Sequence, residues 1–411
     1  MDPFVAGITR GSSLTRRRAF MTHAPANPGR AYVPAAIGTE AATFRATTRI
    51  VAGPGALART RAEVERLGSP RLVVVADRSL DRVGLLQHIL SEARLGDLVV
   101  ETVLTDVDPD PDPIEAAAST ARAANAQAVL AIGGGSGISA AKAVALLLTN
   151  HVPVRSLEGV DKATAPPAPT IAIPTTAGSG SEVSNALVLH DPGRVREITI
   201  RGDGYEPHTA VLDAAVLRGL PTEPLLFAAL DAISHALEAT WARGANIFTD
   251  ACALRAASEL IETLPRAVSG VADGRNAAGG NDPALQRLLE ASALANLACG
   301  NSGLALVHAL SCSPAVPSPH GYQNGVLLPH VAAFNRDVVG PDARDLIDRL
   351  PGLYDAMRFP TRFPEGIADA DAMIAASSGH AFRANNRRES TDDELRDLLL
   401  AAGADYRPAT R

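Results

Sequence analysis

Short apolar runs alternate with amphipathic stretches along the first half of the chain. The apolar runs predict buried strands over residues 47–52, 72–76, 98–104, 128–132, 170–174 and 187–190. The stretches between the early runs predict helices over residues 56–67, 83–95 and 113–124. Such alternation is typical of a parallel sheet that helices cover on both faces. The pattern therefore predicts an N-terminal α/β domain with a parallel sheet.

The pattern changes after Pro221. From there to about residue 400 the strand pattern stops, and Ala- and Leu-rich helical segments follow one another, separated by Pro and Gly. We therefore expect three parts: a disordered tail over residues 1–42, an α/β domain over 43–218 and an all-helical domain over 219–411.

Composition excludes several functional classes. Of the 411 residues, 46% are hydrophobic and the net charge is −7, so we expect a folded protein without a nucleic-acid partner. Polar residues and glycines interrupt every apolar stretch well before the length of a membrane span. The three cysteines show no CxxC spacing, which excludes a disulfide framework and favours the cytoplasm.

Four glycines and a serine follow the predicted strand 128–132. The three successive glycines have no Cβ atoms, so the backbone N–H groups of Gly134, Gly135 and Ser136 can approach a phosphate, and the helix that follows adds partial positive charge. A plain tight turn would need fewer glycines. The segment predicts a pyrophosphate-binding loop.

Two other strand ends carry candidate cofactor contacts. Asp77 follows the strand 72–76, where a carboxylate can accept hydrogen bonds from a ribose and repel the phosphate of NADP. A helix-capping or solvated aspartate is the alternative. The loop after the strand 170–174 offers small hydroxyl side chains that suit a cofactor lying against the backbone, namely Thr175, Thr176, Ser179 and Ser181. A flexible linker is the alternative there.

A candidate metal site lies in the predicted helical domain. Asp231 and His235 are four residues apart, so they share one helix face, although such a pair is often merely solvated. His308 lies in an apolar segment and His320 follows a proline. Together the four residues provide one oxygen and three nitrogen donors, a set that suits Fe²⁺ or Zn²⁺.

These motifs, in this order, resemble the iron-containing (group III) alcohol dehydrogenases of the dehydroquinate synthase-like fold. The resemblance runs from about Phe44 to Asn335 and rests on GPGAL, AD, GGGS, EGVDK, PTTAGSGSEV, DAISHALE, VHAL and PHG. It implies that Asp231, His235, His308 and His320 bind a catalytic metal. It also implies that NAD is lined by the glycine loop, Gly134 to Ser136, and by the hydroxyl loop, Thr175 to Ser181. It further implies that Asp77 faces the adenosine ribose and that the protein is a homodimer.

The sequence departs from the family pattern at several positions. Ser139 replaces an aspartate, as in relatives similar to maleylacetate reductases, and Arg196-Glu197 stands where a lysine usually reaches the nicotinamide ribose. Cys312 replaces a second pocket histidine that usually helps to relay protons. The interval between His308 and His320 is also shorter than usual, from which we expect a more open cleft.

The resemblance implies an NAD-dependent, metal-assisted oxidoreductase that interconverts an alcohol and its aldehyde or ketone. From the departures we expect a specialised, natural-product pathway and a larger substrate, including one carried on a peptide or carrier protein. A partner-dependent or non-catalytic subunit and a maleylacetate reductase-like enzyme are the alternatives. A lyase of the dehydroquinate synthase type is disfavoured, because its phosphate site needs several basic residues and the chain has only two lysines, Lys142 and Lys162.

Overall fold

The computed structural model describes residues 43–68, 71–193, 197–273, 283–311, 318–367 and 369–404. All of them lie in one compact unit, Pro34–Arg411. The disordered tail predicted over residues 1–42 falls outside these ranges.

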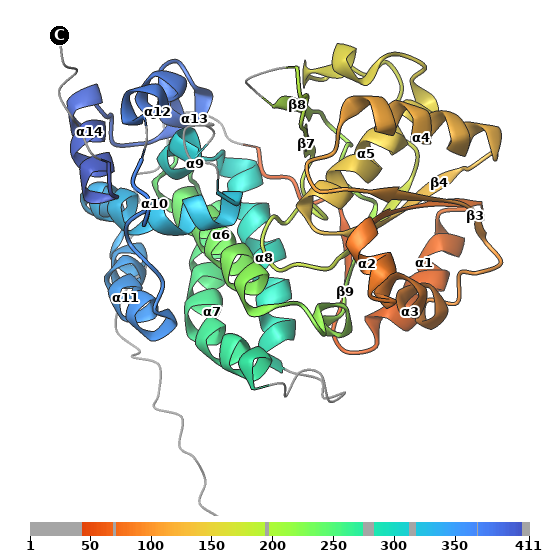
Figure 1. Ribbon diagram of the computed structural model, residues 1–411, viewed down its shortest axis with the longest axis horizontal. Helices are drawn as coiled ribbons and strands as arrows, with labels where there is room; N and C mark the ends of the chain where they lie inside the picture. Colours follow the sequence, from red (N-terminus) through yellow and green to blue (C-terminus); the bar gives the residue numbers. More distant parts are fainter. Residues whose placement is uncertain are drawn as a thin grey trace, which may run out of the picture. The chain divides into compact units, whose positions relative to one another are not determined.

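A six-stranded parallel sheet forms the N-terminal half (Figure 1). Its strands, in spatial order, are β1 (Arg49–Ala52), β9 (Thr209–Leu212), β6 (Thr170–Pro174), β4 (Ala128–Gly133), β2 (Leu72–Asp77) and β3 (Val99–Thr105). The flanking helices are α1 (Thr60–Arg66), α2 (Arg78–Arg82), α3 (Leu85–Glu92), α4 (Pro111–Ala123) and α5 (Gly135–Thr149). The predicted parallel α/β architecture is confirmed.

The central strands are buried on both faces, which explains their continuous apolar runs. In β2, Val74 packs into the core under α1 and α3, whereas its neighbours Val73 and Val75 pack into a separate core under α4 and α5. All three valines have no exposed surface. Side chains of successive strand residues point to opposite faces, so one apolar strand contributes side chains to both cores.

A small second sheet was not predicted. It consists of β5 (Gly159–Val160), β8 (Ile198–Arg201) and β7 (Ala186–Leu189), with β7 antiparallel to β8. Leu187 and Leu189 are buried against the α5 core, while Val188 between them is 37% exposed. Only one face of this sheet is covered, which suits antiparallel pairing.

The predicted helix over residues 83–95 corresponds to α3, which covers Leu85–Glu92. The short helix α2, Arg78–Arg82, lies before the predicted range and was not predicted, and Gly84, with a φ of 75°, separates the two helices. Such a left-handed conformation favours glycine and interrupts a helix.

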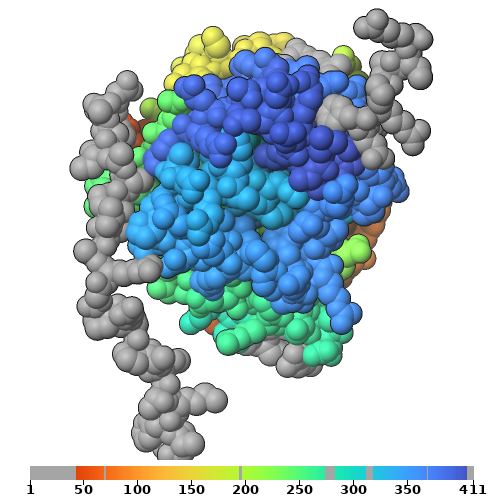
Figure 2. Space-filling view, turned by 90° about the vertical axis from the view of Figure 1, so that its left-hand side faces the viewer, coloured from red at the N-terminus to blue at the C-terminus, as the bar shows by residue number. Residues whose placement is uncertain are grey.

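The chain is helical after Pro221. Its helices are α6 (Thr222–Trp241), α7 (Ile247–Ala272), α8 (Pro283–Ser302), α9 (Leu306–Ser311), α10 (His320–Asn335), α11 (Pro341–Met357), α12 (Ala370–Ser377), α13 (Ala381–Asn385) and α14 (Asp392–Ala401). Short 3₁₀ helices are η1 (Ala56–Arg59), η2 (Val154–Leu157), η3 (Ala214–Leu217) and η4 (Arg336–Val338). Helices α6, α7 and α8 pack against one another, and the helices from α10 onward, in blue, cover much of the face in Figure 2.

None of the helices in the described ranges is long and apolar enough to cross a membrane.

The loop after β6 packs closely against α6. A Cβ atom on Gly178 would lie 2.7 Å from the Cα and from the carbonyl oxygen of Ala228. Contacts this short do not occur, so the absence of a side chain at Gly178 lets the loop approach the helix.

We predict that Gly178→Ala lowers the free energy of unfolding by about 1–3 kcal/mol, because helix backbone must shift to admit the methyl group. Denaturant unfolding measures this change. Gly96→Ala is the matched control, since nothing lies within 4 Å of its Cβ position. Equal stability of both variants would contradict the close approach.

Candidate active site

Helix α6 carries three polar residues on one buried face. Asp231, His235 and Glu238 are spaced by four and three residues, so they lie above one another along the helix. Each is at most 6% exposed, although the surrounding residues of α6 are apolar and buried. Buried polar groups are costly without partners, so this face must meet complementary groups.

Two histidines from other helices meet Asp231. The Nε2 atoms of His308 in α9 and His320 in α10 lie 3.6 and 3.7 Å from Asp231 Oδ1. One ligand atom from each of the three residues lies within 4.8 Å of the other two. Ligands about 2.1 Å from one tetrahedral ion are roughly 3.4 Å apart, so this spacing fits a shared divalent cation.

His235 lies beside this group. Its ring stacks on His308 with centroids 4.8 Å apart, and its Nε2 is 3.8 Å from Asp231 Oδ1. Burial lowers the pKa of His235 to about 4, so its ring is neutral at pH 7. A neutral imidazole can donate a lone pair to a metal, and His235 Nε2 therefore fits as the third nitrogen donor.

Glu238 orients His308. Its Oε2 lies 2.7 Å from His308 Nδ1, and the carboxylate also accepts hydrogen bonds from the backbone N–H groups of Ala305 at 3.0 Å and Val307 at 2.5 Å. With Nδ1 donating to the carboxylate, Nε2 is the ring atom that faces Asp231, and a metal ion held there would take the place of the Nε2 proton. Burial would lower the pKa of His308, but Glu238 and Asp231 raise it to about 9. Sequence reasoning assigned no role to Glu238, although its place one turn beyond His235 could have suggested one.

Asn324 completes the cluster and was also missed from sequence. Its Nδ2 donates a hydrogen bond to Asp231 Oδ1 at 2.7 Å and lies 3.1 and 3.0 Å from the Nε2 atoms of His308 and His320. It follows His320 by one helical turn in α10, which is the signal that could have found it.

The cluster is exposed on one side only. The side chain of His320 is 52% exposed, whereas those of Asp231, His235 and His308 are less than 10% exposed. Of the four predicted metal ligands, His320 is therefore the one that solvent reaches. Cys312, predicted to replace a pocket histidine, falls outside the described residues, as does Arg196.

The predicted pyrophosphate loop connects β4 to the N-terminus of α5. Gly134 precedes the helix, which begins at Gly135. A Cβ on Gly135 would lie 2.9 Å from Ser179 Cβ, and one on Gly134 would lie 3.3 Å from Thr176 Oγ1. The glycine turn and the hydroxyl loop therefore meet, as a shared cofactor site requires.

Asp77, the last residue of β2, points into the same turn. Its Oδ2 accepts a hydrogen bond from the Gly134 N–H at 2.9 Å, while Oδ1 is buried without a partner in the described part of the chain. Burial raises the pKa of Asp77. An unpartnered buried acceptor beside a glycine turn fits a ribose hydroxyl.

The remaining predicted cofactor residues differ in exposure. Ser136 and Ser179 lie in the two facing loops, and Ser136 Oγ accepts a hydrogen bond from the Asp108 N–H at 3.5 Å. Thr175 and Ser181 are only 4% and 6% exposed. The loops thus present Ser136, Thr176 and Ser179 more openly than Thr175 and Ser181.

Lys142 binds the backbone just after the hydroxyl loop. Its Nζ donates hydrogen bonds to the carbonyl oxygens of Ser184 at 2.9 Å and Ala186 at 2.7 Å. Burial lowers the pKa of Lys142 to about 7 and raises that of the neighbouring Glu182 to about 7. Lys142 therefore fixes the backbone between the hydroxyl loop and the start of β7. This is a structural role for one of the two lysines of the chain.

The chain is similar to known proteins along most of its length. Residues 47–214 match the family model described as iron-containing alcohol dehydrogenase, and residues 226–403 match the model of the C-terminal part of the Fe-containing alcohol dehydrogenase family. The chain is 33% identical to the probable alcohol dehydrogenase EutG of Salmonella typhimurium over 88% of this chain and 94% of that protein. It is 32% identical to the NAD-dependent methanol dehydrogenase of Bacillus methanolicus over 69% and 74% of the two chains. The solved iron-containing alcohol dehydrogenase of Thermococcus thioreducens is 28% identical and superposes with a TM-score of 0.76, covering 88% of this chain and 99% of that one.

We predict that Glu238→Gln weakens the binding of Fe²⁺ or Zn²⁺ by about 10- to 100-fold, because the amide no longer fixes the His308 ring as the carboxylate does. Competition with a chelator measures the affinity. Glu92→Gln, an exposed glutamate at the end of α3, is the control. Unchanged metal affinity in a folded Glu238→Gln protein would contradict the orienting role.

Proposed function

Because this chain belongs to the iron-containing alcohol dehydrogenase family, we propose that it is an NAD-dependent oxidoreductase that interconverts an alcohol and its aldehyde or ketone at Fe²⁺ or Zn²⁺. The observation that carries the proposal is the meeting of Asp231, His308 and His320 from three separate helices. We assign these residues and His235 as the metal ligands.

Hydrogen bonds from neighbouring side chains orient two of the proposed metal ligands. Glu238 fixes His308 through Nδ1, and Asn324 fixes Asp231 through its Oδ1. A divalent cation held by this set would act as a Lewis acid that polarises a carbonyl or favours ionisation of an alcohol. Because the ligands are oriented before substrate arrives, little reorganisation is needed during the reaction.

The glycine and hydroxyl loops provide the cofactor side. We assign Gly134, Gly135, Ser136, Thr175, Thr176, Ser179 and Ser181 as residues that line NAD. We assign Asp77 to the adenosine ribose, supported by its Oδ2 hydrogen bond to the Gly134 N–H of the glycine turn; its negative charge would disfavour the additional phosphate of NADP. NAD bound by these loops would supply a hydride acceptor, and the residues that line it would align its nicotinamide with the alcohol carbon.

The half-exposed side chain of His320 supports entry of the substrate from that side. We retain the expectation of a larger alcohol, including one carried on a peptide or carrier protein, in a specialised natural-product pathway. Among the relatives, the enzyme from Bacillus methanolicus is named for methanol, a much smaller alcohol. The homodimer, the cytoplasmic location and a pathway partner subunit also remain part of this proposal.

The proposal predicts that protein purified without chelator contains stoichiometric iron or zinc, binds NAD and forms NADH from an alcohol. His308→Ala removes one ligand, so we expect loss of the metal and of alcohol oxidation while NAD still binds. Elemental analysis, NAD titration and NADH absorbance measure the three properties, with the exposed His151→Ala as control.

The same measurements separate the alternatives. Tight NAD binding without metal would favour a partner-dependent subunit. Metal and NAD with activity on maleylacetate alone would favour the maleylacetate reductase-like alternative. Full activity of His308→Ala would overturn the assigned ligand set.

We predict that Asp77→Asn raises the ratio of kcat/KM with NADP to kcat/KM with NAD by about tenfold or more, because one like-charge repulsion is removed. Steady-state kinetics with both cofactors measure the ratio. Asp81→Asn, an exposed aspartate in α2, is the control. An unchanged ratio would place the adenosine ribose elsewhere.

A further inference from the structure

One side-chain atom lies within hydrogen-bond distance of three proposed metal ligands. Asn324 Nδ2 is 2.7 Å from Asp231 Oδ1. It is also 3.1 and 3.0 Å from the Nε2 atoms of His308 and His320. The ligand atoms lie farther from one another, with Asp231 Oδ1 at 3.6 and 3.7 Å from the two histidine nitrogens. The amide of Asn324 therefore sits over the triangle that these ligand atoms form.

These distances match the angles between ligands of one metal ion. Two donors that are each about 2.1 Å from an ion lie roughly 3.6 Å apart at about 120° and roughly 3.0 Å apart at about 90°. The distances from Asp231 to the histidines fit the wider angle, and those from Asn324 to all three residues fit the narrower one. An ion shared by the three residues would thus lie roughly 2 Å from the amide of Asn324, which is the distance of a ligand.

The oxygen of the amide is the atom suited to this position. Nδ2 carries two hydrogens and offers no lone pair, whereas Oδ1 offers two. A turn of about 180° about the Cβ–Cγ bond exchanges the two atoms without moving the helix. Asn324 is fully buried, and its Oδ1 accepts no hydrogen bond from the described part of the chain, so the turn breaks no contact of Oδ1. The Nδ2 hydrogen bond to Asp231 is replaced by binding of both oxygens to one ion.

We propose that Asn324 is a fifth metal ligand and binds the divalent cation through its side-chain oxygen. This inference rests on the proposed function, because both use the same ion. The donors would be three nitrogens and two oxygens, one more than in a tetrahedral zinc site, and five-coordinate ions occur in catalytic sites. Because the amide is neutral, it adds a ligand without reducing the positive charge that polarises the substrate. Asn324 lies one helical turn beyond His320 in α10, so both side chains reach the same ion.

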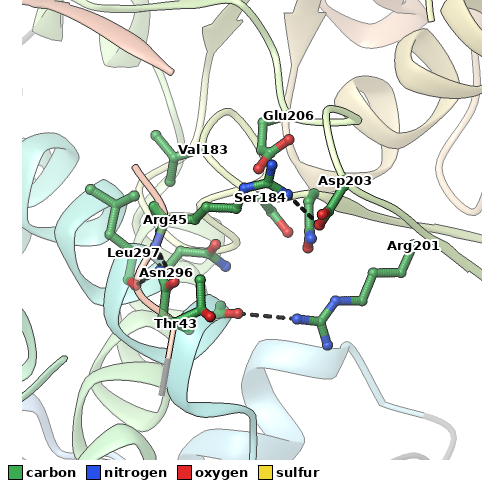
Figure 3. A pocket seen from close by; sticks show the side chains of 12 residues that line it. Thr43, Arg45, Val183, Ser184, Arg201, Asp203, Glu206, Asn296 and Leu297 are labelled. Atoms are coloured by element: carbon green, nitrogen blue, oxygen red, sulfur yellow. Dashed lines mark hydrogen bonds and ion pairs between the residues drawn. The ribbon is translucent and has the colours of Figure 1, made fainter. Parts of the chain in front are cut away.

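Another polar site, the pocket of about 160 Å³ in Figure 3, shows no such convergence among the described residues. Arg45 forms an ion pair with Asp203 there, so the two charges compensate each other. Arg201 donates a hydrogen bond to the Gly300 carbonyl oxygen at 3.3 Å. Within the described ranges, the histidines and carboxylates that could share a metal ion are those grouped around Asp231.

A crystal structure of the full chain with Zn²⁺ bound tests the proposal. We expect Asn324 Oδ1 at about 2.0–2.2 Å from the ion, in the same shell as Asp231 and the histidines. A structure in which Nδ2 faces the ion, or in which both amide atoms lie beyond about 3 Å from it, would overturn the proposal.

The Zn²⁺ affinity of two variants provides a second test. Asn324→Ala removes the ligand, so we expect binding to weaken by about tenfold or more in competition with a chelator. Asn324→Asp keeps an oxygen at the same place, so we expect binding at least as tight as in the wild type. If Asn324 served only to donate a hydrogen bond to Asp231, Asn324→Asp would weaken binding, because an ionised carboxylate cannot donate. That result would overturn the proposal.

Asn335→Ala is the matched control. Asn335 lies in the same helix, is fully buried and donates a hydrogen bond to the Val331 carbonyl oxygen at 3.0 Å. This variant measures the effect of removing a buried amide outside the cluster, and we expect it to leave Zn²⁺ affinity unchanged. Circular dichroism and thermal unfolding establish that each variant is folded.

The outcomes separate this proposal from the proposed function, since no measurement requires turnover. Stoichiometric Zn²⁺ in the wild type with equal affinity in Asn324→Ala would overturn the fifth ligand and leave the other four assigned ligands in place. A wild type that binds no Zn²⁺ would overturn both.

Discussion

The fully buried carboxylate of Glu238 is the constraint on which the metal cluster depends. An ionised group in the interior is tolerated only when hydrogen bonds and opposite charge compensate for lost hydration. Here the first residues of α9 turn their backbone N–H groups toward the carboxylate, and His308 adds its ring N–H. One interaction thus sets where α9 begins and how the His308 ring is oriented. Loss of Glu238 would remove both.

On the cofactor side, the loop that carries Ser179 packs against helices α6 and α8. Helix α6, which carries Asp231, must lie close to the loop that carries Ser179. Gly178 permits this approach, since its missing side chain leaves room for the backbone at Ala228. Asn296 of α8 then binds the Ser179 carbonyl oxygen. Backbone proximity and one amide therefore connect the loop to the helices that hold the metal cluster.

Much of the α/β half could be predicted because its signals are local. The apolar runs of β2 and β4 and the glycines after β4 are each readable within a few residues. The strand at β7 was predicted, but its antiparallel partner β8 was missed because β8 is short and has only two apolar residues, Ile198 and Ile200. The short helix α2 was missed because its sequence, RSLDR, has a single apolar side chain and so shows no periodic pattern.

The metal cluster was only partly readable from sequence. Spacing placed Asp231 and His235 on one face, donor chemistry suggested His308 and His320 as further ligands, and the resemblance implied the same four residues. Nothing local linked the histidines to α6, because that link is made by Glu238 and Asn324 in the folded protein.

The ligand residues also differ in how firmly neighbouring side chains hold them and in how far they are exposed to solvent. His308 is held through both ring nitrogens, by Glu238 on one side and within 3.1 Å of Asn324 on the other. His320 begins α10 and keeps 52% of its side chain exposed. A fixed ligand preserves geometry, whereas an exposed one lies where substrate must arrive. Closing the cluster on all sides would protect the metal but exclude the alcohol, so an oxidoreductase of this design needs one ligand at the surface.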